Sequence, residues 1–511
     1  MSPATLADRA QSTKRPAAYA ELEKRFRRIH LLGDAVGVLQ WDMAAMMPDG
    51  GAAVRGEQLA TLKLVVHEAM TDPALGDLIA AADGETGLDV WQRANHREMR
   101  RAWLHATALP GDLVEALSRA VSICEMRWRA ARADNDFAGL LPSLREVLAL
   151  TRTAASIKAA KLGLGAYDAL LDEYEPGGRS AEIDVLFDDL ARFLPDFTAR
   201  VLARQAAASP ALPLDGPFPT AVQHDLARRL MRVLGFDFAH GRLDTSHHPF
   251  CGGVPDDVRL TTRWDENDFA SGLMGVLHET GHALYERGLP SAWRHQPVGE
   301  ARAMSVHESQ SLLVEMQACR SRAFIEYLAP VAAAAFGKRG PQWTPDNLYR
   351  LYTRVERGVI RVDADEVTYP AHVILRYRLE KAMIAGDLEL ADLPGAWSDG
   401  MKALVGITPP DDRDGCLQDI HWPGGAWGYF PTYTLGAMTA AQLFDAAVRS
   451  LPQIPDAIAR GDFAPLMTWL GANVHAKGSL LSTRDLLIAA SGRALDPAIY
   501  ERHLERRYLA P

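Results

Sequence analysis

The amino-acid sequence predicts a mainly α-helical fold that includes one small β-sheet. Apolar residues recur at steps of three and four through most of the 511 residues, for example between 183 and 193, and this period places them on one face of a helix. The stretch from about 243 to 264 differs, because short runs with Thr, Val and aromatic residues are interrupted by Pro and Gly. We therefore expect helices along most of the chain and a small sheet near its middle.

Local signals indicate where several elements begin and end. Basic residues at 24–28 alternate with apolar ones, which is typical of the solvated face of an amphipathic helix. Four prolines between 209 and 219 favour a linker, so a junction between two lobes is expected near 205–220. Thr344 followed by Pro345 is a typical helix start and predicts a helix over 345–364. The segment 409–436, rich in Pro, Gly and aromatic residues, is long for a connection inside a compact domain and is expected to carry function.

Composition and charge narrow the class of protein. Hydrophobic residues make up 48% and charged residues 23%, as in folded globular chains. Length alone would allow roughly two to four domains, but no internal repeat is visible, and we expect one working unit over residues 1–511. The net charge of -10 is spread along the chain, which argues against nucleic acid or an anionic membrane surface as the partner.

Membrane insertion and secretion are also disfavoured. No segment approaches the roughly 18 consecutive apolar residues that span a bilayer, and residues 1–18 lack the apolar core of a secretory signal. A cytoplasmic location is the resulting expectation. The four cysteines show neither metal-ligand spacing nor the density of a disulfide framework, and are expected to be buried or incidental thiols: Cys124, Cys251, Cys319 and Cys416.

The segment 277–283 contains the pattern His-Glu-x-x-His. His278 and His282 are four residues apart and face the same way on a helix, so both imidazoles can reach one metal ion at roughly 2.0–2.1 Å. Glu279 lies between them, where its carboxylate can take a proton from the attacking water. Helix caps precede the motif and a helix stop follows it: Asp265, Asn267 and Asp268, then Gly288 and Pro290.

A catalytic zinc site usually takes three protein ligands, so a third donor is expected downstream. Glu308, 26 residues after the second histidine, stands early in another helical segment that runs to about residue 319. Glu286 is disfavoured as the third ligand, because it would lie on the wrong side of its helix turn for a contact with the metal. Glu300 and Glu315 fit the spacing as well as Glu308 does, and the residues alone leave these three open.

The motifs resemble those of the carboxypeptidase Taq family of metallopeptidases, often called M32. Besides the His-Glu-x-x-His pattern, the sequence His-Glu-Ser-Gln at 307–310 is similar to that family. Further stretches match it in the same order along the chain: 248–250 (His-Pro-Phe), 257–261 (Asp-Val-Arg-Leu-Thr), 360–365 (Ile-Arg-Val-Asp-Ala-Asp) and 415–422 (Gly-Cys-Leu-Gln-Asp-Ile-His-Trp), with 41–42, 47–48 and 428–436 as weaker matches.

The resemblance implies a mainly helical, two-lobed metallopeptidase with a deep cleft, in which the small sheet lies beside the helix of the metal motif. It implies an enzyme, usually a homodimer, that removes single residues from peptides with a free C-terminus. The usual metal is Zn²⁺, with Co²⁺ able to substitute. By the same resemblance Glu308 is the third metal ligand.

A carboxypeptidase must bind the terminal carboxylate of its substrate, and the planar fork of arginine suits that group. Arg361 stands in the Ile-Arg-x-x-Ala-Asp match. Arg350, Arg354, Arg357 and Arg361 also fall at helical spacing, which would put them on one face of the helix expected over 345–364. Arg361 is therefore the first choice for the substrate contact and Arg350 the second, while pairing with acids on a neighbouring helix is the alternative for the rest of the row.

An oxyanion donor is expected from the region around 409–436. Tyr433, in the Phe-Pro-Thr-Tyr match, is the first choice, and His421 is the second. Trp422 and Trp427 are expected in the core. His248 could contact substrate or serve as a structural hydrogen-bonding residue.

Three supporting roles follow from the same motifs. Gly281, a weak helix former inside the metal motif, is expected to let another segment approach the metal helix closely. A carboxylate should orient the ligand histidines, and Asp365 is one suggestion for it. The residues Asp257, Arg259 and Asp419 are expected to brace the cleft.

The sequence thus predicts a zinc-dependent carboxypeptidase in which Glu279 activates water, Tyr433 or His421 holds the oxyanion and Arg361 fixes the substrate's end. One alternative is a zinc oligopeptidase that cuts internal bonds. Another is a catalytically silent zinc-bearing protein that binds peptides, although zinc binding alone does not require Glu279.

Overall fold

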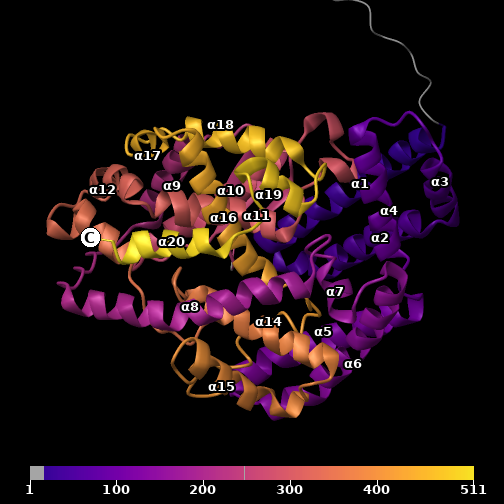
Figure 1. Ribbon diagram of the computed structural model, residues 1–511, viewed down its shortest axis with the longest axis horizontal. Helices are drawn as coiled ribbons and strands as arrows, with labels where there is room; N and C mark the ends of the chain where they lie inside the picture. Colours follow the sequence, from indigo (N-terminus) through magenta and orange to yellow (C-terminus); the bar gives the residue numbers. More distant parts are fainter. Residues whose placement is uncertain (1–16, 247, 511) are drawn as a thin grey trace, which may run out of the picture.

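The computed structural model describes residues 17–246 and 248–510. The segment 1–18, in which we find no secretory core, lies almost wholly outside this range. Within the described residues the chain is mainly helical and carries one three-stranded sheet, as the sequence predicts (Figure 1). The elements pack around three hydrophobic clusters, one formed by the N-terminal helices and two larger ones in an upper and a lower lobe.

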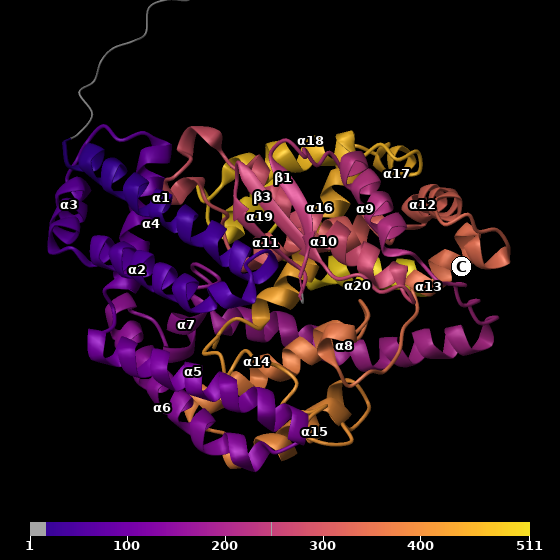
Figure 2. The same cartoon turned by 180° about the vertical axis from the view of Figure 1, so that it is seen from behind.

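The N-terminal helices lie at one end of the molecule, beside both lobes (Figures 1 and 2). Tyr19, Leu22 and Phe26 on the first helix pack against Leu75 and Ile79. The basic residues at 24, 27 and 28 are exposed on the opposite side, which confirms an amphipathic helix. The group comprises α1 (Ala17–Ala45), α2 (Ala52–Thr71), α3 (Pro73–Asp83) and α4 (Val90–Ala106).

The lower lobe is a helical layer around the second large cluster. Its apolar residues come from two distant parts of the chain, about 120–201 and 355–441, with the last helix packed on them. The helices are α5 (Gly111–Asp134), α6 (Phe137–Leu162), α7 (Ala166–Leu171), α8 (Ser180–Ala207), α14 (Tyr369–Ala385) and α15 (Leu393–Leu404), and α20 (Pro497–Tyr508) closes the top of this lobe (Figure 1).

The upper lobe surrounds the helix that carries the His-Glu-x-x-His motif. Helix α16 contributes apolar residues to both large clusters, so it joins the lobes. The helical elements are α9 (Thr220–Leu234), α10 (Phe269–Gly288), α11 (Met304–Leu312), the π-helix η4 (Leu313–Cys319), α12 (Arg322–Ala335), α13 (Pro345–Tyr352), α16 (Pro431–Ser450), α17 (Ile454–Ile458), α18 (Ala464–Asn473) and α19 (Thr483–Ser491).

The sheet lies where the sequence predicts it, beside the helix of the metal motif. Strand β3 (Asp257–Thr262) is central, parallel to β1 (Gly241–Thr245) and antiparallel to β2 (Phe250–Val254), with Leu260 opposite both Leu243 and Cys251. Helix α10 packs against β2 and β3, and α1 contacts β2 (Figure 2). The buried residues of β3 therefore support α10 from one side.

The helix expected over 345–364 is much shorter, and this prediction is wrong. Thr344 caps its start as expected, by accepting a hydrogen bond from the backbone N–H of Asn347, but α13 ends at Tyr352. Beyond it the side chain of Gln205 on α8 exchanges two hydrogen bonds with the backbone of Val355. These long-range bonds replace the helical ones, so the row of arginines does not form one helical face.

The connections between elements agree better with the sequence-based prediction than the helix after Thr344 does. Residues 208–219 run without regular structure from α8 of the lower lobe to α9 of the upper one. The long segment after 409 is irregular until α16 begins at Pro431, so Tyr433 stands in a first helical turn. Trp422 and Trp427 are buried in the core, and all four cysteines are free, three of them buried.

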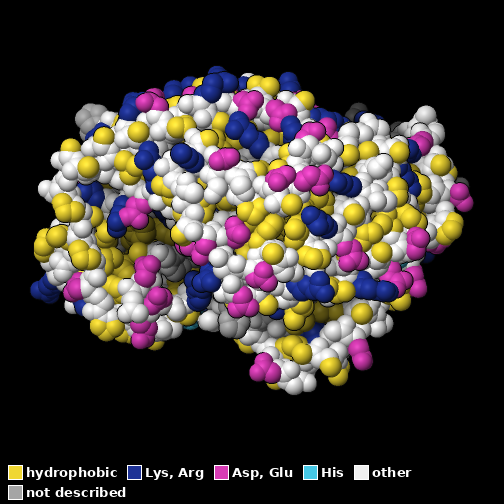
Figure 3. All heavy atoms as spheres, turned by 90° about the horizontal axis from the view of Figure 1, so that it is seen from below, with side chains coloured by type: hydrophobic (Ala, Val, Ile, Leu, Met, Phe, Trp, Pro, Cys, Tyr) yellow, Lys and Arg dark blue, Asp and Glu magenta, His cyan; other side chains and the backbone are white. Residues whose placement is uncertain are grey.

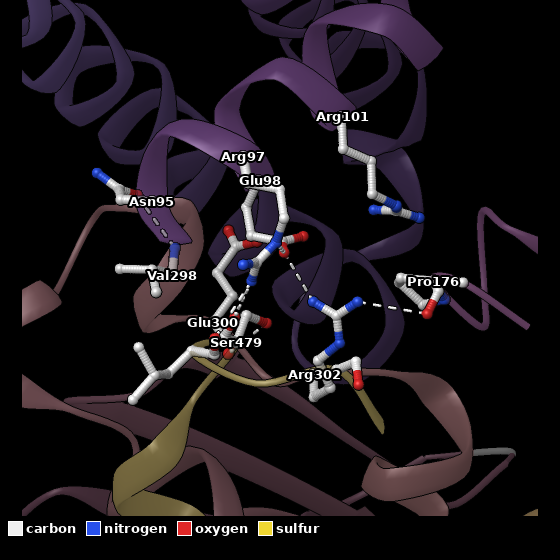
Figure 4. Close-up of polar contacts among 12 residues, drawn as sticks. Asn95, Arg97, Glu98, Arg101, Pro176, Val298, Glu300, Arg302 and Ser479 are labelled. Carbon is white, nitrogen blue, oxygen red and sulfur yellow. Dashed lines mark hydrogen bonds and ion pairs between the residues drawn. The ribbon is translucent and has the colours of Figure 1, made fainter. Parts of the chain in front are cut away.

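Buried polar contacts hold the segment that leads into α11 (Figure 4). Arg302 donates to the carboxylate of Glu98 on α4 at 2.9 Å and to the carbonyl of Pro176 at 3.3 Å. The carboxamide of Asn95 accepts a hydrogen bond from the backbone N–H of Val298. Three distant parts of the chain thus meet just before Met304, where α11 begins.

The surface is mixed in character. On the face seen in Figure 3, acidic and basic side chains are scattered among hydrophobic and other side chains. Among the described helices, none is both long and apolar enough to cross a membrane.

Candidate active site

Helix α10 has the form that the sequence predicts. Asp268 caps it by accepting hydrogen bonds from the backbone N–H groups of Ala270 and Ser271. The helix ends at Gly288, and the rings of His278 and His282 stand side by side with centroids 5.0 Å apart. The four-residue spacing therefore places both imidazoles on one face.

Helix α11 brings Glu308 to these histidines. Its carboxylate Oε2 lies 3.5 Å from Nε2 of His282 and 4.0 Å from Nε2 of His278, and the potential ligand atoms of the three residues all lie within 4.8 Å of one another. Ligands at roughly 2.1 Å from one ion in tetrahedral geometry are roughly 3.4 Å apart, so these three donors fit a common metal ion. Within the described residues no other such group of His, Cys, Asp and Glu is found.

Two glycines permit this approach. A Cβ atom on Gly281 would lie 2.5 Å from the carbonyl oxygen of Gln310 and 2.7 Å from Cα of Ser311, both on α11. A Cβ on Gly436 of α16 would lie 2.8 Å from Cβ of Glu308. The close approach expected at Gly281 is present, and the approaching segment is the helix that carries Glu308.

The carboxylate that orients His278 is Glu315. Its Oε2 accepts a hydrogen bond from Nδ1 of His278 at 2.9 Å, and its Oε1 accepts from Arg320 at 2.6 Å. Asp365, suggested above, is wrong for this role, because its side chain accepts hydrogen bonds from the backbone N–H and the hydroxyl of Thr368. Glu315 stands seven residues after Glu308, on the π-helix η4 that continues α11.

A histidine that the sequence analysis left without a role orients His282. Nδ1 of His282 and Nδ1 of His307 are 2.6 Å apart, and Nε2 of His307 lies 2.8 Å from Oε1 of Glu286. If Nε2 of His282 faces the metal, its Nδ1 carries the proton, His307 accepts through Nδ1 and donates from Nε2 to Glu286. The His-Glu-Ser-Gln motif contained this residue, but only the fold shows its partners.

The surroundings of the site shift the pKa values of His282, His278 and Glu279. Burial and the neighbouring His307 lower the pKa of His282 to about 4, which keeps this imidazole neutral. Burial lowers the pKa of His278, but Glu315 and Glu308 outweigh it and raise the value to about 10. Burial also raises the pKa of Glu279 to about 7, assisted by the negative charge of Glu308. A bound cation would lower the pKa of all three groups, which opposes the rise at His278 and Glu279 and adds to the lowering at His282.

A cavity of about 490 Å³ lies between the lobes. His278, Glu279 and Glu308 form the upper wall, and Arg361 and Tyr433 belong to the facing wall. Arg361 is buried, and its guanidinium carbon lies 5.1 Å from the centre of the Tyr433 ring. The fold thus brings five of the predicted site residues around one cavity.

Three other predicted site residues lie elsewhere. His421 does not line the cavity; its Nε2 lies 3.2 Å from the hydroxyl of Tyr433, which does. His248 is exposed, and only its neighbour Pro249 reaches the cavity. Arg350 belongs to a different cavity and donates to the carbonyl of Ser209, because α13 ends well before Arg361. His248 and Arg350 therefore do not line this cavity.

Comparison with known proteins identifies the family. The sequence model of the carboxypeptidase Taq (M32) metallopeptidases matches residues 21–508. The chain belongs to this family. Thermostable carboxypeptidase 1 of Thermus thermophilus is 38% identical over 505 residues, which cover 97% of this chain and 99% of that protein.

Solved structures of M32 carboxypeptidases also match the whole fold. Trypanosoma cruzi metallocarboxypeptidase 1 has a TM-score of 0.95 and 43% identity, over 96% of this chain and 99% of that one. The M32 carboxypeptidase from Deinococcus radiodurans has a TM-score of 0.91 and 33% identity, over 96% and 99%. This M32 protein is therefore a metallocarboxypeptidase that depends on a divalent metal and acts on peptides. An internal-bond oligopeptidase and a silent zinc-bearing protein are not favoured.

Proposed function

We propose that His278, His282 and Glu308 hold a zinc ion, which cobalt can replace, and that Glu279 is the general base of peptide hydrolysis. The observation that carries this proposal is the convergence of three donors within 4.8 Å of one another, two of which, His278 and Glu308, line the cavity together with Glu279. Two imidazoles and a carboxylate form a donor set common in catalytic zinc sites. When bound there, a divalent ion supplies Lewis acidity to the scissile carbonyl and to the attacking water.

Glu279 takes the proton from the attacking water and passes it to the leaving amine. The side chain is buried on the same helix as the two histidines, so its carboxylate is held beside them. Burial keeps bulk water away from this carboxylate and strengthens its interaction with a nearby proton donor.

Tyr433 donates a hydrogen bond to the oxyanion from the opposite wall of the cavity. Its hydroxyl is 3.2 Å from Nε2 of His421, whose buried Nδ1 makes no hydrogen bond among the described residues and lies 3.9 Å from Oδ1 of Asp419. We assign the proton of His421 to Nε2, because this tautomer donates to the phenol oxygen of Tyr433. His421 is then a positioning residue.

Arg361 binds the C-terminal carboxylate of the substrate. Three of its five N–H groups are used: Nε and Nη2 donate to Oδ1 of Asp419 at 3.0 and 2.8 Å, and Nη1 donates to the hydroxyl of Tyr369 at 2.9 Å. One N–H on each terminal nitrogen remains, which is the pair that a bidentate carboxylate requires.

Three further proposals rest on the family resemblance or on the arrangement of the chain. The enzyme acts as a homodimer in the cytoplasm. It works as a single catalytic unit over 1–511, which the cavity supports because both lobes contribute to its walls. Light scattering of the purified enzyme tests the dimer.

The roles of Glu279 and Arg361 are tested with a peptide in free-acid and C-terminal amide forms. Glu279→Gln should retain the metal and lose nearly all turnover, and retention of more than about a tenth of wild-type kcat would rule out the general base, since such groups contribute about 10²–10⁴-fold. Arg361→Ala should retain the metal and lose the preference for the acid, with a cost of about 2–5 kcal/mol in transition-state binding of the acid only. An unchanged acid-to-amide ratio would move the carboxylate anchor elsewhere.

A further inference from the structure

The carboxylate of Asp419 lies between two buried arginines, and only one of them reaches the cavity. Its Oδ1 accepts hydrogen bonds from Arg361, as described above, and its Oδ2 accepts from Nε of Arg376 at 2.6 Å. Arg376 belongs to α14, is fully buried, and does not line the cavity. The group therefore contains two cations and one anion.

The two histidines and two tyrosines around these three residues add no charge to the group, and the carboxylate of Glu308 acts on both phenols from the metal-ligand side of the cavity. Burial lowers the pKa of His372 to about 3 and that of His421 to about 4, so both imidazoles are neutral. Burial raises the pKa of the phenols of Tyr369 and Tyr433, which therefore remain protonated. The cluster retains one net positive charge close to the cavity wall.

Contacts around Arg376 hold it in place. Nη1 donates to the carbonyl of His372 at 2.8 Å, and the guanidinium lies 4.4 Å from the centre of the Trp397 ring. Nη2 is buried and makes no hydrogen bond within residues 17–246 and 248–510. A guanidinium with an unsatisfied donor in the core costs stability. The presence of Arg376 here therefore calls for a reason other than stability.

A neutral partner in place of Arg376 would change the balance at Arg361. Asp419 would then neutralise Arg361 alone, and a substrate carboxylate would meet a neutral ion pair. With Arg376 sharing Asp419, the same carboxylate fixes the orientation of the Arg361 fork while one positive charge is left for the ligand. Low dielectric inside the protein strengthens this attraction.

We propose that Arg376 is a positioning residue for carboxypeptidase activity: by sharing Asp419 it leaves Arg361 oriented and net positive toward the C-terminal carboxylate of a peptide. This inference rests on the proposed role of Arg361. It adds a determinant of the preference for free C-termini that never touches the substrate.

The test uses metal-loaded enzyme and the ratio of kcat/KM for a free-acid peptide to that for its amide. Arg376→Gln should raise KM for the acid by about tenfold or more, with kcat and the amide reaction little changed, because it removes binding shared by the ground and transition states. Arg376→Lys should retain most of the preference. The matched control is Arg378→Gln on the same helix, whose arginine pairs with Asp188 at 2.6 Å on the exposed side and should leave the ratio unchanged.

The charge argument is tested by a rescue. Adding Asp419→Asn to Arg376→Gln restores one net positive charge, so the double variant should recover part of the acid preference. A wild-type ratio in Arg376→Gln, or a double variant no better than the single one, would overturn the inference. Should Arg376→Gln not fold, Asp419→Asn is compared with the double variant: the inference expects the higher KM for the acid in the double variant, and equal values would overturn it.

Failure of this inference is distinguishable from failure of the proposed anchor. If Arg361→Ala abolishes the acid preference while Arg376→Gln retains it, only the role of Arg376 is wrong. If neither variant changes the ratio, Arg361 is not the anchor.

Discussion

Replacement of Gly281 by alanine tests whether the close contact of α10 and α11 sets the geometry of the metal site. The new Cβ would lie 2.5 Å from the carbonyl oxygen of Gln310, where ordinary van der Waals contact begins at 3.4 Å, so the helices must part by about 0.9 Å. Metal ligands tolerate errors of only about 0.2 Å. We expect the affinity for zinc to fall by roughly 10–100-fold, comparable to the loss of a group that orients a ligand.

The same change should also cost stability. Overpacking of a close contact costs about 1–3 kcal/mol, which opposes the gain of up to about 1 kcal/mol from replacing glycine inside a helix. Gly471→Ala on α18 is the control, because no atom lies within 4 Å of its new Cβ and it should only gain. The metal-free Gly281 variant should therefore be about 1–3 kcal/mol less stable than the control.

Zinc affinity is measured by competition with a chelator, and stability by urea unfolding of the metal-free proteins. The reasoning would be refuted by a Gly281→Ala enzyme that is stabilised as much as Gly471→Ala and binds zinc with wild-type affinity. If Gly281→Ala loses zinc affinity but not stability, α11 shifts away from α10 at little cost in folding free energy and carries Glu308 away from the histidines.

Other predictions concern the ligand set and a buried acid. Glu308→Ala should lower zinc affinity by more than about 100-fold, and Glu300→Ala should not lower it at all. Glu315→Ala should lower it by about 10–100-fold, because the hydrogen bond that orients His278 is lost while all three ligands remain. Chelator competition ranks the three variants, and zinc retained fully in Glu308→Ala would move the third ligand. Burial raises the pKa of Glu380 from 4.5 to about 7, so the folded state binds the extra proton and stability should fall as pH rises from about 4.5 to 7. Glu380→Gln should remove up to roughly 3 kcal/mol of that fall, as measured by urea unfolding at pH 5 and pH 8; parallel wild-type and variant profiles would contradict this.

Short-range signals account for what the sequence predicts correctly. The helix of the metal motif, its cap at Asp268 and its end at Gly288 depend on residues within a few positions of one another. The unusual glycine at 281 likewise signals a close approach before the approaching segment is known. The small sheet follows from a local change in composition near 243–264.

The errors arise where distant segments compete with local preference. The spacing of the arginines from 350 to 361 is helical, but the chain at Val355 bonds to Gln205 on α8, 150 residues away, and the helix stops. Arg361 therefore reaches the cavity from a short 3-10 turn. Arg350, eleven residues earlier, faces another cavity.

The sequence by itself predicted the helical class and the helix that places His278, His282 and Glu279 close together. Only the tertiary structure decided between Glu308 and Glu315, giving one to the cluster of ligand atoms and the other to His278. It also showed that Asp419 pairs with both Arg361 and Arg376. The physical reason is range: residues four apart on a helix meet by geometry alone, whereas the partner of a buried charge depends on how segments a hundred or more residues apart pack together.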